Sequence, residues 1–255
     1  MSSFFTIQHL SKSFGGVKAV QNLSFTVNKG EIFSIIGPNG AGKSTVFNCI
    51  NGLYKPTGGS ISFQGEALIG KRPDQISRLG IARTFQNLEL FAHMSTMDNI
   101  LLGRHLHMKS SLFAIAARCH PRMGPSKEEI AHRGRVEEII DFLDLQAARN
   151  TFVSALPYGQ QKIVELGRAL ATEPQLLLLD EPAAGLNQEE REELVFWIKD
   201  IRDQFGITVI LIEHNMQLVT QISDRLLALN FGQKLVEGSV EEVINHPEVI
   251  RAYLG

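Results

Sequence analysis

The chain has 255 residues, of which 44% are hydrophobic, and its 25 basic and 27 acidic residues leave a formal net charge of −2 at pH 7. This length can bury one sizeable core, either as a single domain or as a domain with an inserted lobe. The balanced charge argues against nucleic acid as a partner, and no apolar run reaches the roughly 20 residues of a membrane helix.

Four short apolar runs follow one another along the chain and predict strands buried on both faces of a parallel sheet. They are 31–36 (EIFSII), 81–85 (IARTF), 176–179 (LLLL) and 207–212 (ITVILI). Helical patterns at 43–51, 188–204 and 215–222 separate several of them, and alternation of strand and helix is typical of an α/β fold.

Each of these runs ends in a residue that can do chemistry. The end residues are Gly37, Gln86, Asp180 with Glu181, and Glu213 with His214. Ligands of open α/β sheets bind at the carboxyl ends of the strands. The sequence therefore predicts a binding site at this edge of the sheet.

The first run leads into a complete G-x-x-x-x-G-K-[ST] motif, GPNGAGKST, whose glycines allow backbone N–H groups to cradle phosphate oxygens. We expect Lys43 to reach the β- and γ-phosphates of ATP and the Ser44 hydroxyl to bind Mg²⁺. The dipole of the helix that follows also favours phosphate. The expected phosphate loop consists of Gly37, Pro38, Asn39, Gly40, Ala41, Gly42, Lys43, Ser44 and Thr45.

The other strand ends complete this nucleotide site. We expect Asp180 to hold Mg²⁺, directly or through water, and Glu181 to polarise the water that attacks the γ-phosphate. Without the phosphate loop, an ordinary strand end with solvated acids would explain this pair as well. His214 can donate a hydrogen bond to the γ-phosphate, and Gln86 can touch Mg²⁺ or the attacking water. These two are weak signals alone and gain weight from their shared position.

The middle of the chain, from about 87 to 159, predicts a helical lobe. Ser95 or Thr96 is placed to cap one helix, and Ser126 with Glu129 forms a capping box for another. Between them lies a stretch, within 104–125, that contains Lys109, Arg118 and Arg122. It suits either contact with a membrane surface or partner helix, or a solvated loop.

The segment ALPYGQQ (155–161) opens a further helix of this chain. Pro157 is tolerated at a helix start because the N–H there has no intrahelical partner. The free N–H groups of such an N-terminus form an anion site, and Gly159 lets a phosphate approach closely. Since the chain already has a phosphate loop, this second site suggests completion by another copy of the fold.

Together these motifs resemble the ATP-binding subunits of ABC transporters over essentially the whole chain. The resemblance implies an α/β P-loop NTPase with a mainly parallel core sheet, an N-terminal antiparallel β subdomain and an inserted α-helical subdomain. One ABC ATPase domain would span residues 1–255. Its core lobe would comprise 1–86 and 160–255, and its helical subdomain would comprise about 87–159.

The resemblance also implies a head-to-tail dimer in which ATP lies between the phosphate loop of one subunit and the LPYGQQ segment of the other. Tyr158, Gly159 and Gln160 would then contact the nucleotide of the partner, although Pro157 replaces the usual serine of the family motif. Phe14 would stack on adenine with Val20 beside it; the other interpretation of Phe14 is a core aromatic residue.

Within the family, LPYGQQ, DEPAAGLN, LIEHNM and the terminal NHPEVIRAYLG are most similar to the LivG-type ATPases of branched-chain amino-acid importers. This implies a peripheral subunit on the cytoplasmic face of the inner membrane. Its partners would be a second ATPase in a hetero- or homodimer, two membrane permeases and, indirectly, an external solute-binding protein. Residues 88–91 would receive the coupling helix of the permease.

Other solutes, such as urea or short amides, stay open because other chains recognise the solute. A clamp or remodelling ATPase that acts on DNA or ribosomes is disfavoured because the sequence has neither a second phosphate-loop motif nor a sustained heptad run. A non-catalytic binder of ATP is disfavoured because Lys43, Asp180, Glu181 and His214 are all present.

Overall fold

The computed structural model describes residues 4–84, 88–108 and 127–254. The chain divides into two compact units, a core unit (1–86 and 175–255) and a helical unit (87–174). The sequence predicts the second boundary of the helical unit at about residue 159. Helix α6 (Tyr158–Leu170) packs on α3 (Thr96–Leu102), so the compact helical unit extends to residue 174. None of the helices in the described ranges is long and apolar enough to cross a membrane.

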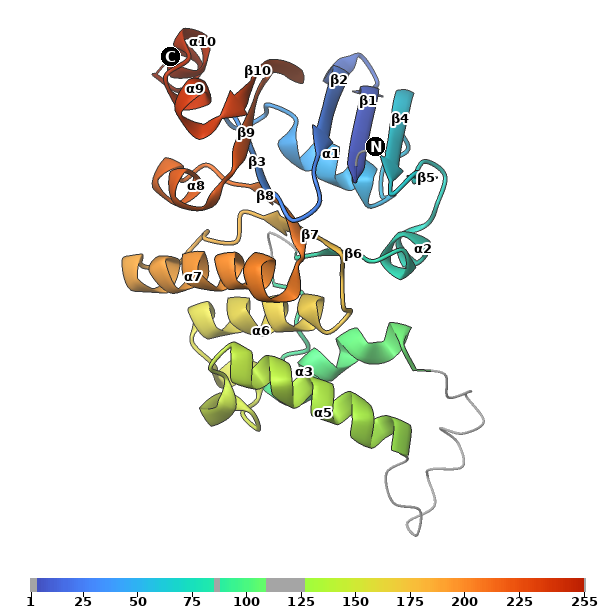
Figure 1. Cartoon of the computed structure of the whole chain (residues 1–255), viewed down its shortest axis with the longest axis vertical. Coiled ribbons are helices and arrows are strands. Elements are labelled where there is room, and N and C mark those ends of the chain that lie inside the picture. The colour runs from blue at the N-terminus through green and yellow to red at the C-terminus, as the bar shows by residue number, and fades with distance from the viewer. Residues whose placement is uncertain (1–3, 85–87, 109–126, 255) are drawn as a thin grey trace. The chain divides into compact units, whose positions relative to one another are not determined.

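A six-stranded sheet forms the centre of the core unit, with the order β10-β9-β3-β8-β7-β6 (Figure 1). Its strands are β3 (Ile32–Ile36), β6 (Ile81–Arg83), β7 (Leu176–Asp180), β8 (Thr208–Ile212), β9 (Arg225–Asn230) and β10 (Gln233–Ser239). The four strands predicted from the apolar runs are confirmed and are mutually parallel neighbours. Two further strands were not predicted: β9, which is parallel to β3, and β10, which is antiparallel to β9.

The register of this sheet brings the ends of its central strands to one edge. In the β7–β8 pair the last partners are Asp180 and Ile212, and in the β3–β8 pair they are Ile35 and Ile212. The residues that follow these pairs, among them Gly37, Glu181 and Glu213, therefore emerge at the carboxyl edge.

A second, antiparallel sheet has the order β2-β1-β4-β5. Its strands are β1 (Phe5–Phe14), β2 (Val17–Val27), β4 (Gly58–Phe63) and β5 (Glu66–Ala67). Side chains from this sheet and from the parallel sheet share one buried cluster, in which the rings of Phe25 and Phe33 stack with centroids 5.2 Å apart. This burial of apolar area holds the two sheets together.

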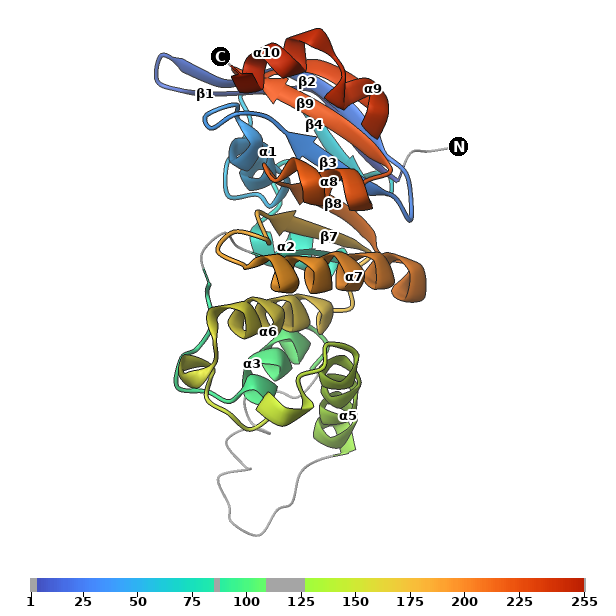
Figure 2. The ribbon, with the colours of Figure 1, turned by 90° about the vertical axis from the view of Figure 1, so that its left-hand side faces the viewer.

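The described part of the core unit also contains six helices, which are labelled in Figure 2. They are α1 (Lys43–Ile50), α2 (Pro73–Arg78), α7 (Gln188–Phe205), α8 (Met216–Ile222), α9 (Val240–Ile244) and α10 (Pro247–Leu254). Helix α1 buries Val46, Phe47 and Ile50 in the cluster between the two sheets. A second cluster joins Val243 of α9 and Val249 of α10 to Ile36 of β3. The residues just before Gly37 are therefore fixed by packing on both sheet faces.

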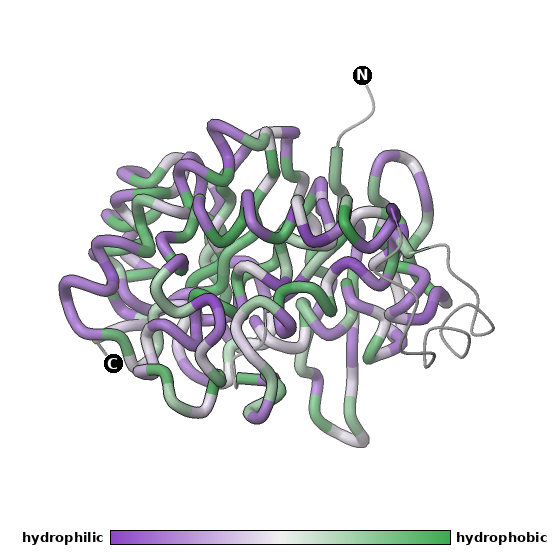
Figure 3. Tube along the Cα trace, turned by 90° about the horizontal axis from the view of Figure 1, so that it is seen from below, coloured by the Kyte–Doolittle hydropathy of each residue, from purple (hydrophilic) through white to green (hydrophobic). Residues whose placement is uncertain are grey.

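The helical unit contains α3, α5 (Lys127–Phe142) and α6, with short 3₁₀ turns at Gly103–Leu106, Gln146–Ala148 and Val153–Ala155. Ser95 directly precedes α3, and its hydroxyl accepts the Asp98 N–H at 3.1 Å, so Ser95 and not Thr96 is the cap. The hydropathy-coloured trace shows both hydrophilic and hydrophobic residues along the helices, as amphipathic helices require (Figure 3).

Candidate functional site

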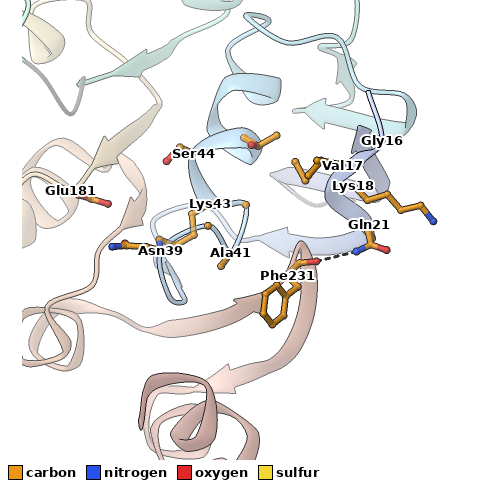
Figure 4. A pocket seen from close by; sticks show the side chains of 14 residues that line it. Gly16, Val17, Lys18, Gln21, Asn39, Ala41, Lys43, Ser44, Glu181 and Phe231 are labelled. Atoms are coloured by element: carbon orange, nitrogen blue, oxygen red, sulfur yellow. Dashed lines mark hydrogen bonds between the residues drawn. The ribbon is translucent and has the colours of Figure 1, made fainter. Parts of the chain in front are cut away.

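A cavity of about 720 Å³ opens in the core unit at the phosphate loop (Figure 4). Residues 39–45 of the loop and of the first turn of α1 form one wall. Residues 16–19, at the turn from β1 into β2, form another, and Gln21, Glu181 and Phe231 complete the lining. The cavity is large enough for a nucleotide, since small-molecule sites typically measure about 300–1,000 Å³.

The phosphate loop has a shape that only glycine permits at two positions. Gly42 has φ 101°, and a Cβ there would lie 2.4 Å from the carbonyl oxygen of Ala19. Gly37 has φ 153°, and its Cβ would lie 2.3 Å from the carbonyl oxygen of Leu229. The loop is therefore pressed against β2 and the end of β9, which fixes its path.

Lys43 lies inside this loop and is only 5% exposed. Its ammonium group donates to the carbonyl oxygens of Gly37 at 2.7 Å and Pro38 at 3.1 Å. Burial lowers the pKa of Lys43, while the charges of Glu181 and Asp180 act in the opposite direction. The Lys43 ammonium can exchange these two carbonyl contacts for hydrogen bonds to phosphate oxygens.

Asp180 ends β7 and forms an ion pair with Arg83 of β6, with 2.7 Å between Oδ2 and Nη2. Arg83 also donates to the Asn48 side chain of α1 at 2.7 Å. The other carboxylate oxygen, Oδ1 of Asp180, is buried and has no hydrogen-bond partner in the structure. Buried polar atoms are normally satisfied, so this oxygen fits a ligand for a divalent cation.

Glu181 follows β7 with φ 49°, which is unusual for a residue with a side chain. Its N–H donates to the Ile212 carbonyl at 2.9 Å, which fixes this backbone conformation. The carboxylate lines the cavity, and its Oε2 lies 3.8 Å from Nδ1 of His214. Strained conformations of this kind concentrate at functional sites. The structure thus brings together Lys43, Asp180, Glu181 and His214 at the ends of β3, β7 and β8. The fourth predicted strand end, Gln86, lies outside the described residues.

Glu213 precedes His214 and is 1% exposed. Its carboxylate accepts the N–H groups of Ala183 at 2.9 Å, His214 at 3.1 Å and Asn215 at 3.3 Å. These bonds tie the turn that follows Glu181 to the segment that carries His214. No role of Glu213 was predicted, although an acid at the end of an apolar strand indicates a position at the binding edge of the sheet.

The predicted adenine contacts lie beside the cavity rather than in its lining. Phe14 is 43% exposed, its ring meets that of Tyr54 edge-on with centroids 5.1 Å apart, and the Lys12 ammonium lies 4.7 Å from its centroid. Val20 is 1% exposed and belongs to the core. Val17, exposed and in the cavity wall, was not anticipated. Val17 follows two glycines and precedes Lys18, and this local sequence has no pattern that predicts a ligand contact.

The LPYGQQ segment lies in the helical unit at the start of α6. Pro157 is the N-cap residue, with φ −53° and ψ 151°, and provides no side-chain cap. Tyr158 and Gln160 are exposed, whereas Gly159 is buried. The expected helix start is therefore confirmed to within one residue.

Several predictions concern parts of the chain outside the described residues. These are the role of Gln86, most of the basic stretch with Lys109, Arg118 and Arg122, and the cap at Ser126. Arg83, by contrast, is described and was missed, because a single arginine at the end of a short strand has no distinctive pattern.

Two family models match the sequence. One is described as "ABC transporter" and matches residues 20–184. The other is described as "Branched-chain amino acid ATP-binding cassette transporter" and matches residues 233–255.

The similar proteins cover almost the whole chain. The "High-affinity branched-chain amino acid transport ATP-binding protein LivG" of Salmonella typhimurium is 43% identical over 249 residues, which are 98% of this chain and 96% of the relative. A nucleotide-free ATP-binding cassette from an ABC transporter superposes with a TM-score of 0.86 at 31% identity. A cassette in its ADP conformation does so with a TM-score of 0.85 at 30% identity. Both superpositions cover 100% of each chain.

Proposed function

Because this chain belongs to the ABC transporter family, we propose that it binds ATP in the cavity at the phosphate loop and hydrolyses it to drive the import of branched-chain or other hydrophobic amino acids. The observation that carries the ATPase assignment is the convergence of Lys43, Asp180, Glu181 and His214 at one sheet edge. The solute follows from relatives named as branched-chain amino acid transport proteins.

Nucleotide binding begins at the phosphate loop. The N–H groups of residues 40–45 and the start of α1 would bind the phosphates. Lys43 would exchange its contacts with the Gly37 and Pro38 carbonyls for the β- and γ-phosphate oxygens. We assign the adenine contact to Phe14 with Val17, since Val17 lines the cavity and Phe14 is its partner in the β1–β2 register. Val20, which is 1% exposed, would support this wall from the core.

Glu181 is assigned as the general base. Its carboxylate would take a proton from the water that attacks the γ-phosphate. His214 lies next to it and would donate a hydrogen bond to the γ-phosphate oxygens as charge develops there. Glu213 would hold both residues in register through its bonds to the N–H groups of Ala183 and His214.

Mg²⁺ fits the donor set of this site. The Ser44 hydroxyl and the unpaired Oδ1 of Asp180 would hold the ion, and Gln86 is assigned as a further ligand. Bound there, Mg²⁺ would neutralise charge on the phosphate oxygens. Arg83 fixes the Asp180 carboxylate for this role through its ion pair.

The active form that we propose is a head-to-tail dimer with a second ATPase subunit, identical or homologous. Tyr158, Gly159 and Gln160 of each subunit would complete the nucleotide site of the other. Two membrane permeases would bind the dimer on the cytoplasmic face of the inner membrane, next to residues 88–91, and an external protein would deliver the solute. Phe91 is 56% exposed and thus available for such a contact.

The decisive test of the enzymatic assignment is a pair of carboxylate-to-amide variants in the purified chain. Glu181→Gln should lower ATP hydrolysis at least about 100-fold while keeping ATP binding, and should trap an ATP-bound dimer detectable by light scattering. Glu193→Gln, the same change at an exposed position of α7, is the control. Steady ATP hydrolysis by Glu181→Gln would show that Glu181 is not the general base.

The transport assignment needs a separate experiment. The chain should be isolated from its native membranes in mild detergent and its companions identified. Two membrane permeases and a second ATPase would support the importer, and uptake by the reconstituted complex would distinguish leucine from urea or short amides. Recovery with ribosomes or DNA alone would refute transport and leave the ATPase assignment intact.

A further inference from the structure

We propose that Tyr253, in the C-terminal helix α10, is a positioning residue of the nucleotide site that sets ATP affinity through the first glycine of the phosphate loop. The Tyr253 hydroxyl accepts a hydrogen bond from the Gly37 N–H at 2.7 Å. The two residues are 216 positions apart in the chain, and both belong to the core unit. The proposal rests on the assignment of this cavity as the nucleotide site.

The Gly37 N–H lies where the sheet can no longer pair it. The β3–β9 register ends at Ile36 with Ala228, and the β3–β8 register ends at Ile35 with Ile212. Gly37 itself is buried. A buried N–H without a partner is costly, and the Tyr253 oxygen satisfies this one.

The same residue of the loop is also held through its carbonyl group. The Gly37 carbonyl accepts the Lys43 ammonium at 2.7 Å, and a Cβ at Gly37 would strike the Leu229 carbonyl oxygen. Tyr253, Lys43 and Leu229 therefore fix the orientation of Gly37 together. Of these three contacts, the Lys43 contact must break when the ammonium turns to phosphate, and the Tyr253 contact then keeps the loop in shape.

Helix α10 is anchored independently of the hydroxyl. Val249 is 3% exposed and packs in the cluster that contains Ile36, the residue before Gly37. The His246 carbonyl also accepts the N–H groups of Val249 and Ile250 at 3.0 Å. Because packing fixes the helix, removal of one oxygen atom from Tyr253 should leave the fold unchanged.

The neighbouring hairpin of the C-terminal segment supports the loop in the same way. The Gly232 N–H, in the turn between β9 and β10, donates to the Ala41 carbonyl at 2.9 Å. Two elements near the end of the chain thus hold the two ends of the phosphate loop, α10 at Gly37 and the hairpin at Ala41. Burial raises the pKa of Tyr253, so its hydroxyl stays neutral at physiological pH.

The first test measures nucleotide binding in the full-length chain. The variant Tyr253→Phe removes only the hydroxyl and should weaken binding of a fluorescent ATP analogue three- to tenfold, since a preorganised loop binds more tightly. KM for ATP should rise by the same factor with kcat within twofold. Arg251→Ala, an exposed change on the same helix, is the matched control and should bind as the parent does.

The second test observes the hydrogen bond directly. Only two Ile-Gly pairs occur in the sequence, Ile36-Gly37 and Ile69-Gly70. Protein labelled with ¹³C-carbonyl isoleucine and ¹⁵N-glycine should therefore give two NMR cross-peaks, from Gly37 and Gly70. In the parent the Gly37 amide should exchange slowly with solvent. In Tyr253→Phe this amide should exchange at least tenfold faster, and Gly70 should not change.

The outcomes separate this proposal from the function on which it rests. If Lys43→Ala binds the analogue as well as the parent, the nucleotide site itself is misassigned. If Lys43→Ala loses binding but Tyr253→Phe weakens it no more than Arg251→Ala, only the role of Tyr253 is overturned. Rapid exchange of the Gly37 amide in the parent protein would also overturn it, whatever the stability of the variant.

Discussion

Arg83 and Asp180 form an ion pair whose side chains are 9% and 2% exposed, with 2.7 Å between Nη2 and Oδ2. Removal of the guanidinium in Arg83→Met would leave the buried Asp180 carboxylate without its ion-pair partner. We expect a loss of about 3–5 kcal/mol in the free energy of unfolding, measured by urea denaturation, together with loss of ATP hydrolysis.

The control for this pair is Asn48→Ala, which removes the second contact of Arg83 but keeps its charge beside Asp180. This variant should lower the free energy of unfolding by only about 1–2 kcal/mol. Equal losses in the two variants would mean that packing of the Arg83 stem, rather than its charge, supports Asp180.

Glu213 should affect catalysis more than binding. Its carboxylate bonds to the N–H groups of Ala183 and His214, so Glu213→Ala would free the segments that carry Glu181 and His214. Small displacements of reacting groups can cost up to about 100-fold in rate. We expect kcat to fall at least about tenfold, with the Kd for ATP within threefold of the parent, measured by phosphate release and nucleotide titration.

The more conservative variant Glu213→Gln tests the same idea with less change in volume. An amide group offers one accepting oxygen where the carboxylate offers two, so at least one of the N–H groups would lose its partner. An intermediate loss of kcat is expected. Unchanged kcat in both variants would show that the sheet alone positions Glu181.

The sequence predicted the parts of this molecule that follow from local patterns. Continuous apolar runs identified β3, β6, β7 and β8 because each is buried on both faces. Strand β10 was missed because its residues are mostly half-exposed, so it has no clear apolar run. Strand β9, with its run Leu226–Leu229 buried, has the same kind of apolar run, although it was not among the predicted strands.

The candidate site divides in the same way. The phosphate loop and the acids after β7 have distinctive spacing, so the sequence predicts them. Arg83, Phe231 and Tyr253 reach the site from distant parts of the chain, through pairing and packing that no local pattern records. For Glu213, the sequence predicts the position at the end of a strand, but it does not predict the three N–H groups that its carboxylate accepts.

The two glycines Gly40 and Gly42 provide a matched pair of substitutions. Both have positive φ, 81° and 101°, so alanine at either position incurs backbone strain of about 1–2 kcal/mol. At Gly42 a Cβ would also lie 2.4 Å from the Ala19 carbonyl oxygen, whereas at Gly40 nothing lies within 4 Å. Gly42→Ala should therefore displace the loop and abolish nucleotide binding.

Gly40→Ala should lower the free energy of unfolding only by the backbone strain and should keep measurable nucleotide binding. Thermal unfolding and titration with a fluorescent nucleotide distinguish the two variants. Equal loss of binding in both would mean that the strained backbone, rather than the collision with Ala19, decides the shape of the loop.

Pro157 should be replaceable by serine without loss of the fold. Pro157 is the N-cap of α6 and provides no side-chain acceptor for the free N–H groups of the helix. The hydroxyl of Pro157→Ser would supply one, which typically stabilises a helix by about 0.5–2 kcal/mol. We expect a higher midpoint of thermal unfolding and a tighter ATP-dependent dimer, measured by light scattering in the Glu181→Gln background.

Pro157→Ala is the control, because it also removes the ring but adds no hydroxyl. Dimer affinity that rises equally in both variants would assign the effect to release of the proline ring. No change in either variant would show that the cap residue of α6 has no part in dimer formation.

The buried thiol of Cys49 should make the stability of the chain depend on pH in the alkaline range. The thiol, in α1, is 3% exposed, and burial raises its pKa from the usual 9.0 to about 11, with Lys12 acting weakly in the opposite direction. The pKa of the thiol is higher in the folded state than in the unfolded chain. The protonated thiol therefore makes its full contribution to the free energy of unfolding below about pH 9. This contribution is lost as the pH rises from 9 to 11, by about 2–3 kcal/mol in total.

The comparison is with Cys49→Ala, which has no thiol to ionise. Other groups also titrate above pH 9, so the informative quantity is the difference between the two proteins in free energy of unfolding. This difference should be constant from pH 7 to about 8.5 and should shrink between pH 9 and 11, since only the parent loses the thiol contribution. A constant difference up to pH 11 would mean that the thiol ionises in the folded state as readily as in the unfolded chain.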